Sequence, residues 1–236
     1  MKRRSLLLSG AGLAGALVVG WGLLPPRSRL GHPDSLADTD GRIALNGWIR
    51  IAPDGHVVLA MNRSEMGQGV HTALAMLAAE ELDVPLARIE LVDAGADAFY
   101  GNVAVLVGSL PFHPSDSEPG QETRGVRAGR WVVGKLAREL GLSLTGGSSS
   151  VADAWEPVRL AAATARAQLL GAASLRWKLP ADELVVADGA IAHAGDGRRA
   201  HYGELAGTAA ATPPGPVSLK PREQWKLIGH TVPRDR

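Results

Sequence analysis

The chain has 236 residues, of which 45% are hydrophobic, with 25 basic and 24 acidic residues and no cysteine. This length and apolar content are enough to build a hydrophobic core, which excludes general disorder. The near-neutral balance of charge provides no broad basic face, so no nucleic-acid partner is expected. The absence of cysteine excludes disulfides, thiolate metal ligands, a cysteine nucleophile and iron–sulfur clusters carried by this chain.

Residues 1–30 have the pattern of an export signal. Three cations at positions 2–4 precede the uncharged run Ser5–Leu24, which two prolines close. The adjacent Arg3 and Arg4 before a serine and three leucines fit a twin-arginine signal, the route of proteins that fold around a cofactor before export. An ordinary signal or a membrane anchor stays open as an alternative, because a run of this length can span a bilayer. We expect a periplasmic protein, anchored in the inner membrane if the segment is retained.

A linker, a hairpin and a helix follow in chain order. Residues 31–42 are polar and rich in turn formers, which predicts the linker. Two apolar runs, Trp48–Ile51 and His56–Met61, flank the turn sequence PDG and predict a β-hairpin. Apolar residues then recur at helical spacing and predict a helix from about Val70 to Leu82. The stretch ARIELVDA after this helix is expected to form a short strand.

The central part of the chain is predicted to contain a loop and two helices. Residues 97–123 contain three prolines and no apolar period, which predicts an extended loop. A second helix, ending at Gly141, is indicated by four apolar residues at helical spacing, Val126, Val133, Leu136 and Leu140. A third helix begins after LSLTGGSSS and carries apolar residues along one face. Asp153 lies in its first turn, where a carboxylate suits the helix dipole.

The last third of the chain returns to strands. The stretch ELVVADGAIAHA places an Asp-Gly turn between two apolar runs and predicts a second hairpin. The proline-rich, charged residues 213–236 are expected to form a linker. Together, the elements predict an α+β fold in which β-hairpins and short strands pack with about three helices.

Two glycine-rich turns stand directly before two of the predicted helices. Each helix start offers unpaired backbone N–H groups and partial positive charge, and glycine lets the main chain approach a bound group closely. The turns are therefore candidate anion sites, although a plain turn with a helix cap is the competing interpretation. The side-chain amide of Gln68 suits the edge of a heterocycle or an oxo group. The candidate binding residues are Gly67, Gln68, Gly69, Gly146, Gly147, Ser148, Ser149 and Ser150.

Other familiar site patterns are missing from the sequence. GQGVHTAL lacks the third glycine of a Rossmann fingerprint, and no Gly-Lys-Ser/Thr follows GGSSS, so neither common nucleotide site is predicted. The histidines form no metal-binding pair, and the serines lack the context of an esterase nucleophile. Glu80 and Glu81 are adjacent on a helix and point about 100° apart, which argues against an acid–base pair. No catalytic or metal-binding residue is therefore assigned.

Four stretches of sequence, in a fixed order, carry a resemblance to a known family. They are NGWIRIAPDGHVVL, SEMGQGVHTALAMLAAEELDVPLARIEL, LTGGSSSVADAWEPVRLAAATARAQLL, and YGELA with VSLKPREQWKLIG. Over residues 43–236 the chain resembles the amino-terminal part of the molybdopterin-binding (large or β) subunit of xanthine dehydrogenase/aldehyde oxidase-type molybdenum hydroxylases, in particular the isoquinoline 1-oxidoreductase β-subunit group. The resemblance implies a partial molybdopterin-binding domain over residues 43–212 and then a linker, 213–236, towards a downstream domain.

The resemblance also implies a cofactor and partners. The cofactor would be the molybdenum–molybdopterin cytosine dinucleotide, and the eight candidate residues of the two turns would lie against it. The family's chemistry is oxidative hydroxylation of N-heterocycles or oxidation of aldehydes. Electrons would leave through a separate [2Fe–2S] small subunit, which agrees with the absence of cysteine here. A cytochrome would be a further electron acceptor.

The chain is much shorter than members of that family. Their substrate-side domain and general-base glutamate lie beyond the point that corresponds to VPRDR, so no glutamate here inherits that role. We therefore expect an amino-terminal fragment that needs the rest of the large subunit in trans and is inactive alone. Two alternatives stay open: an exported, membrane-tethered binding or assembly module without catalysis, and a fragment that does not fold stably.

Overall fold

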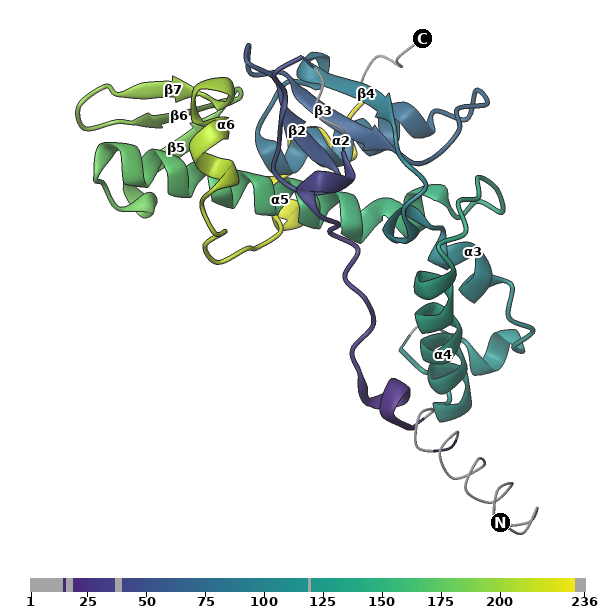
Figure 1. Ribbon diagram of the computed structural model, residues 1–236. Helices are drawn as coiled ribbons and strands as arrows, with labels where there is room; N and C mark the ends of the chain where they lie inside the picture. Colours follow the sequence, from purple (N-terminus) through teal and green to yellow (C-terminus); the bar gives the residue numbers. More distant parts are fainter. Residues whose placement is uncertain (1–14, 16–18, 37–39, 119, 232–236) are drawn as a thin grey trace.

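The computed structural model describes residues 15, 19–36, 40–118 and 120–231. Most of the expected export signal lies outside this part of the chain and stays a prediction. Helix α5 (Ser150–Trp177) runs beneath two small sheets, and the pair α3 and α4 projects from its N-terminal end (Figure 1). The predicted α+β fold is therefore confirmed. Within the described ranges, none of the helices combines the length and apolar character that crossing a bilayer requires.

The first sheet has four strands in the order β1-β2-β3-β4. The first three strands are antiparallel neighbours, whereas β3 and β4 are parallel and are connected through helix α2. The predicted first hairpin is confirmed as β2 and β3, and the predicted strand after the helix is confirmed as β4. The strand bounds are Ile43–Ala44, Ile49–Ile51, Val57–Met61 and Ile89–Asp93.

Helix α2 (Val70–Leu82) matches its predicted bounds and packs against both the first sheet and α5. Leu74 and Leu82 are fully buried in this layer. The facing part of α5 carries small buried residues, which include Ala161 and Ala165, so the two helices approach closely. This contact forms the centre of the hydrophobic core and fixes how the two helix starts lie relative to each other.

The loop predicted over residues 97–123 is wrong in part, because it contains helix α3 (Val103–Gly108). This helix is too short to show a period, and it depends on a cap in which Asn102 Oδ1 accepts from the Val105 N–H at 3.0 Å. Helix α4 (Arg124–Leu140) is the predicted second helix and packs along α3. Gly141 ends it in the left-handed conformation, with φ +60°.

The second sheet has three antiparallel strands, β5 (Leu184–Ala187), β6 (Ala190–His193) and β7 (Arg199–His201). The predicted hairpin around the Asp-Gly turn is confirmed as β5 and β6. Helix α6 (Tyr202–Ala210) follows and packs on α5. The buried Tyr202 hydroxyl donates to the Leu82 carbonyl at 2.5 Å, so this unit is attached to the end of α2.

Candidate functional site

The structure brings the two glycine-rich turns together. The backbone N–H of Ser64 donates to Thr145 Oγ1 at 3.0 Å, so turn 64–69 lies beside turn 145–150 although 81 residues separate the bonded pair. The first turn leads into α2 and the second into α5, and these helices pack against each other. Two helix starts, whose first backbone N–H groups have no acceptor within the helix itself, therefore lie next to each other.

The first turn depends on two glycines in the left-handed region. Gly67 has φ +88° and Gly69, the N-cap residue of α2, has φ +82°. A side chain is strained at such angles whatever the space around it. A Cβ atom on Gly67 would have no neighbouring atom within 4 Å, so the space above this turn is open. The turn is exposed and can be approached by a ligand.

A carboxylate of the chain itself occupies the start of α2. Glu65 Oε1 accepts from the N–H groups of Gly67 at 2.8 Å and Gly69 at 2.9 Å, and Oε2 accepts from that of His71 at 3.1 Å. These backbone hydrogen bonds, the one from Gly69 first, lower the pKa of Glu65 below its ordinary value. The three N–H groups thus point at one oxyanion. Sequence reasoning missed Glu65, and the only signal was an acidic residue two positions before the first glycine of the turn.

The side chain of Gln68 closes this turn. Its Nε2 donates to the Ser64 carbonyl at 2.9 Å, and its Oε1 accepts from the Met66 N–H at 2.5 Å. Both ends of the amide are therefore engaged within the turn. In this structure Gln68 holds the backbone N–H groups of the turn in place, while its second N–H and second lone pair stay available on an exposed side chain.

One part of the second turn is held by hydrogen bonds, and the other part is exposed. Ser149 is buried, its Oγ donates to the Gly146 carbonyl at 2.7 Å, and it accepts from Asn102 Nδ2 at 2.7 Å. Gly147 and Ser148 are exposed and both have positive φ, +60° and +54°. Ser150 is the first residue of α5. The accessible groups of this turn are therefore the backbone and hydroxyl of residues 146–148.

Asp153 is a buried residue of α5 that connects this helix to the segment before the first turn and to the start of α3. Its carboxylate accepts from Arg29 at 3.1 and 2.7 Å and from Arg63 at 2.5 Å. It also accepts from the backbone N–H groups of Val103 at 2.8 Å and Ala104 at 3.0 Å, which form the first turn of α3. Only 1% of the Asp153 side chain is exposed. Two guanidinium groups and two helix N–H groups compensate the buried charge, so this residue has a structural task that its place in the first turn of α5 does not reveal.

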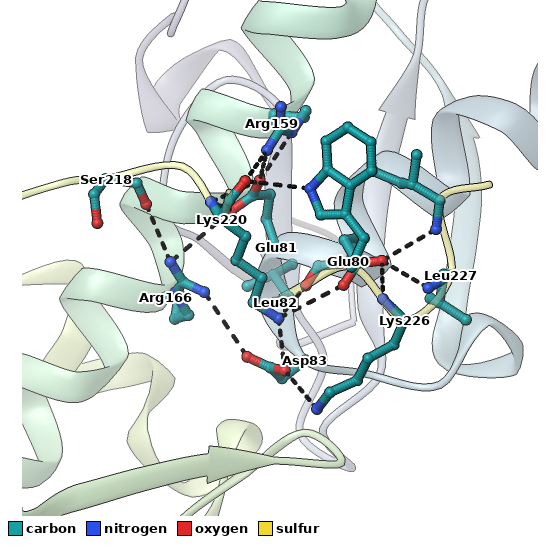
Figure 2. A network of polar contacts seen from close by, with 12 residues as sticks. Glu80, Glu81, Leu82, Asp83, Arg159, Arg166, Ser218, Lys220, Lys226 and Leu227 are labelled. Carbon is teal, nitrogen blue, oxygen red and sulfur yellow. Dashed lines mark hydrogen bonds and ion pairs between the residues drawn. The ribbon is translucent and has the colours of Figure 1, made fainter. Parts of the chain in front are cut away.

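A second polar network lies at the opposite end of α2 (Figure 2). Glu81 Oε1 accepts from Arg159 at 2.8 and 2.6 Å, and neither side chain is more than 6% exposed. Glu80 Oε2 accepts from three consecutive backbone N–H groups at 2.9, 2.7 and 3.1 Å, those of residues 226–228. The Lys220 ammonium lies 2.6 Å from Asp83 Oδ1. The two adjacent glutamates thus hold different partners and attach residues 220 and 226–228 to the helix.

Comparison with known proteins gives the family context of this geometry. Residues 11–104 match the sequence model of a family described as "Molybdopterin cofactor-binding domain". The matched range includes Gly67, Gln68 and Gly69 of the first turn, whereas the second turn lies beyond it.

Three individual matches extend over most of the chain. The chain is 28% identical to "Isoquinoline 1-oxidoreductase subunit beta" of Brevundimonas diminuta over 81% of its own length and 25% of that protein. It is 26% identical to "Membrane-bound aldehyde dehydrogenase [pyrroloquinoline-quinone]" of Gluconacetobacter polyoxogenes over 98% of its length and 25% of that protein. The crystal structure of quinoline 2-oxidoreductase from Pseudomonas putida 86 aligns with 72% of this chain and 17% of that chain, at 19% identity and a TM-score of 0.41. The chain spans about a quarter of the length of the first curated relatives it matches.

Proposed function

The chain is homologous to the molybdopterin-binding subunits of molybdenum hydroxylases, and we propose that it supplies part of the binding site for a molybdopterin dinucleotide. The observation that carries this proposal is the pair of adjacent turns, one of which holds a carboxylate on three backbone N–H groups. A pyrophosphate offers the same kind of oxygen acceptor with more negative charge. The first turn would hold that group, and the exposed residues 146–148 would face it from the second turn.

The donors of the first turn fit an anionic group in both direction and space. The N–H groups of Gly67, Gly69 and His71 converge on the two carboxylate oxygens of Glu65. The turn is exposed, and no atom of the described residues lies within 4 Å of a Cβ built on Gly67. Gln68 keeps the donors in position by its two hydrogen bonds within the turn. The donors are therefore arranged before a ligand arrives, which reduces the entropy lost on binding.

Glu65 must leave these donors before a phosphate can bind. Two anionic groups repel each other and cannot share one set of N–H donors. Glu65 is exposed, so its carboxylate can move into water without being stranded in the core. In this arrangement the carboxylate satisfies the donors of the turn and competes with the cofactor for them, so it lowers the apparent affinity of the site.

The proposal extends to the activity of the larger assembly. The cofactor would be the molybdenum–molybdopterin cytosine dinucleotide, which when bound supplies the redox chemistry for hydroxylating N-heterocycles or oxidising aldehydes. The chain would contribute an amino-terminal part of the large subunit and hold the anionic end of the group. The rest of the large subunit, a [2Fe–2S] small subunit and a cytochrome acceptor are the proposed partners. We also propose export by the twin-arginine route, with the signal retained or cleaved.

The test is the molybdenum and pterin content of the protein purified from its native source with whatever co-purifies. Stoichiometric molybdenum, with iron in a partner chain, is the expected result. The decisive variant is Gly67→Val, because a β-branched residue at φ +88° distorts the turn. A matched control is Gly197→Val, since that glycine also has a positive φ, +73°, with no atom within 4 Å of an added Cβ.

The two valine variants separate loss of the site from general strain. We expect molybdenum to fall sharply in Gly67→Val and to stay near the wild-type content in Gly197→Val, with the same helical circular dichroism in both. Equal molybdenum contents in the two variants would contradict the assignment of the first turn. A wild-type protein without molybdenum would favour the second candidate function, an exported, membrane-tethered assembly module. The observation on its side is that Glu65 already satisfies the donors of the turn.

A further inference from the structure

Helix α4 leaves an apolar stripe uncovered among the described residues. Val132, Leu136 and Leu140 recur every four residues on one face and are 40%, 46% and 63% exposed. Leu142 and Leu144, each 45% exposed, extend the apolar surface past the end of the helix. A cluster of this kind on a projecting helix indicates an interaction surface, whereas single exposed apolar residues do not.

The same helix is strongly basic. Between residues 124 and 140 it has five cations, Arg124, Arg127, Arg130, Lys135 and Arg138, against one carboxylate, Glu139. Arg124 and Arg127 are exposed in the first turn. Arg130 pairs with Glu122 of the preceding segment. A helix with an apolar stripe and an excess of exposed arginine has the composition of an element that lies on an anionic membrane surface.

The last part of the uncharged N-terminal run docks on α4. The rings of Trp21 and Trp131 meet edge to face with centroids 6.4 Å apart. The Lys135 ammonium donates to the Leu24 carbonyl at 2.6 Å and lies 4.2 Å from the centre of the Trp21 ring. Leu23, beside these contacts in the chain, is 82% exposed. The apolar surfaces of residues 19–24 and of α4 therefore lie side by side.

The position of this unit suits contact with a flat surface. The α3 and α4 pair projects away from both sheets (Figure 1), and Trp21 and Leu24 contact the middle of α4 at Trp131 and Lys135. Surfaces on a projecting element can reach a bilayer without a collision from the rest of the molecule. The chain then returns through Leu142 and Leu144 to the second glycine-rich turn, so contact at α4 would also set the orientation of the candidate site.

We infer that α4 lies on the surface of an anionic lipid bilayer. Val132, Leu136 and Leu140 enter the boundary between headgroups and acyl chains, Arg124 and Arg127 lie among the phosphates, and the exposed apolar side chains of residues 19–24 enter the same bilayer. The lipid surface is favoured over a protein partner by charge complementarity and by the apolar N-terminal run that is attached to α4. This contact is separate from the cofactor site and goes beyond the proposed export signal, because the apolar stripe of α4 lies outside residues 1–30.

The absence of cysteine from the chain gives a site-specific test. Leu136→Cys on α4 and the control Leu175→Cys, at a residue of α5 that is 64% exposed, each create one thiol for an environment-sensitive dye. The full-length chain is mixed with vesicles of phosphatidylcholine with or without phosphatidylglycerol. We expect a blue shift of dye emission at position 136 but not at 175. Binding to vesicles without the anionic lipid should be weaker by roughly tenfold or more.

Every result of this labelling experiment bears on the inference. No shift at position 136 would overturn it and would point to a protein partner for the stripe. Equal shifts at 136 and 175 would also overturn it, because they indicate adsorption of the whole chain. Equal binding to both kinds of vesicle would overturn the role of the arginines. A shift confined to position 136 on anionic vesicles supports the inference as stated.

A second pair of variants measures, without a dye, how much the apolar stripe of α4 contributes to vesicle binding. Leu136→Ser with Leu140→Ser should weaken co-sedimentation with anionic vesicles by about tenfold, because two leucines no longer enter the lipid. The control pair, Leu175→Ser with Val185→Ser, removes two residues of similar exposure elsewhere and should bind like the wild type. Both pairs keep the N-terminal run. Unchanged binding of the α4 pair, with unchanged circular dichroism, would overturn the inference.

Discussion

The two ends of helix α2 use the same chemistry for opposite purposes. At its start, Glu65 accepts from three backbone N–H groups in an exposed turn. At its end, Glu80 accepts from three backbone N–H groups of residues 226–228, and only 1% of its side chain is exposed. Water can replace the first carboxylate, whereas the second is buried and water reaches its position poorly. Burial, rather than the number of hydrogen bonds, therefore separates a replaceable ligand from a structural tie.

The largest expected effect concerns the buried end of α2. Arg159→Met removes the guanidinium from Glu81, whose side chain is fully buried, and leaves its charge poorly compensated. The free energy of unfolding should fall by about 3 to 5 kcal/mol. Urea denaturation followed by circular dichroism measures it. Arg130→Met is the control, because its ion pair with Glu122 is 37% and 27% exposed and should contribute less than about 1 kcal/mol. Similar losses in both variants would contradict the structural role of the buried pair.

A smaller but more direct test compares the two capping carboxylates. Glu80→Ala removes the acceptor of three part-buried N–H groups and should lower the free energy of unfolding by about 2 to 3 kcal/mol. The amide hydrogens of residues 226–228 should also exchange faster. Glu65→Ala should have a much smaller effect on stability, because water reaches its three donors. Equal losses from the two substitutions would remove the distinction between the two ends.

The elements of the fold that could be predicted are those whose pattern is local. The first hairpin, α2, α4 and the hairpin around Asp188 and Gly189 follow from period and turn chemistry, and all four are present. Helix α3 could not be predicted, because six apolar residues show no period and its first N–H groups depend on Asp153, 50 residues away. The same holds for α6, which is short and attached to Leu82 through Tyr202.

The candidate site also has features that the sequence predicts and features that it does not. The glycines of the two turns are visible in the sequence because helix starts have a recognisable chemistry. Their adjacency is not visible, since it depends on the packing of α2 on α5 and on the bond from Ser64 to Thr145. The role of Glu65 was also hidden, because an exposed glutamate in a loop has no distinctive pattern. The sequence therefore reveals the backbone N–H donors at a helix start more easily than it reveals the side chain that accepts from them.

At the exposed end of α2 we expect a change in anion affinity, a prediction that rests on the proposed anion site. Glu65→Ala frees the N–H groups of Gly67 and Gly69, so inorganic pyrophosphate should bind roughly tenfold more tightly than to the wild type. Amide chemical shifts of the two glycines during titration provide the measurement. Glu204→Ala is a control, because Glu204 is also an exposed carboxylate near a helix start, where it accepts from the His201 N–H at 3.3 Å. Unchanged affinity at the α2 turn would mean that Glu65 does not compete for it.

The smallest expected effect is the pH dependence of the same turn. Backbone hydrogen bonds, chiefly from Gly69, hold the pKa of Glu65 below its ordinary value of 4.5. Because the folded-state pKa is lowered, the contribution of this carboxylate to stability is present at neutral pH and is lost as the pH falls through the folded-state pKa. The Gly67 and Gly69 amide shifts should therefore titrate with a midpoint below 4.5, and Glu65→Gln should abolish this titration. A midpoint at or above that value would mean that the carboxylate is not held by the turn in solution, and the α2 donors would then be open to another anion without competition.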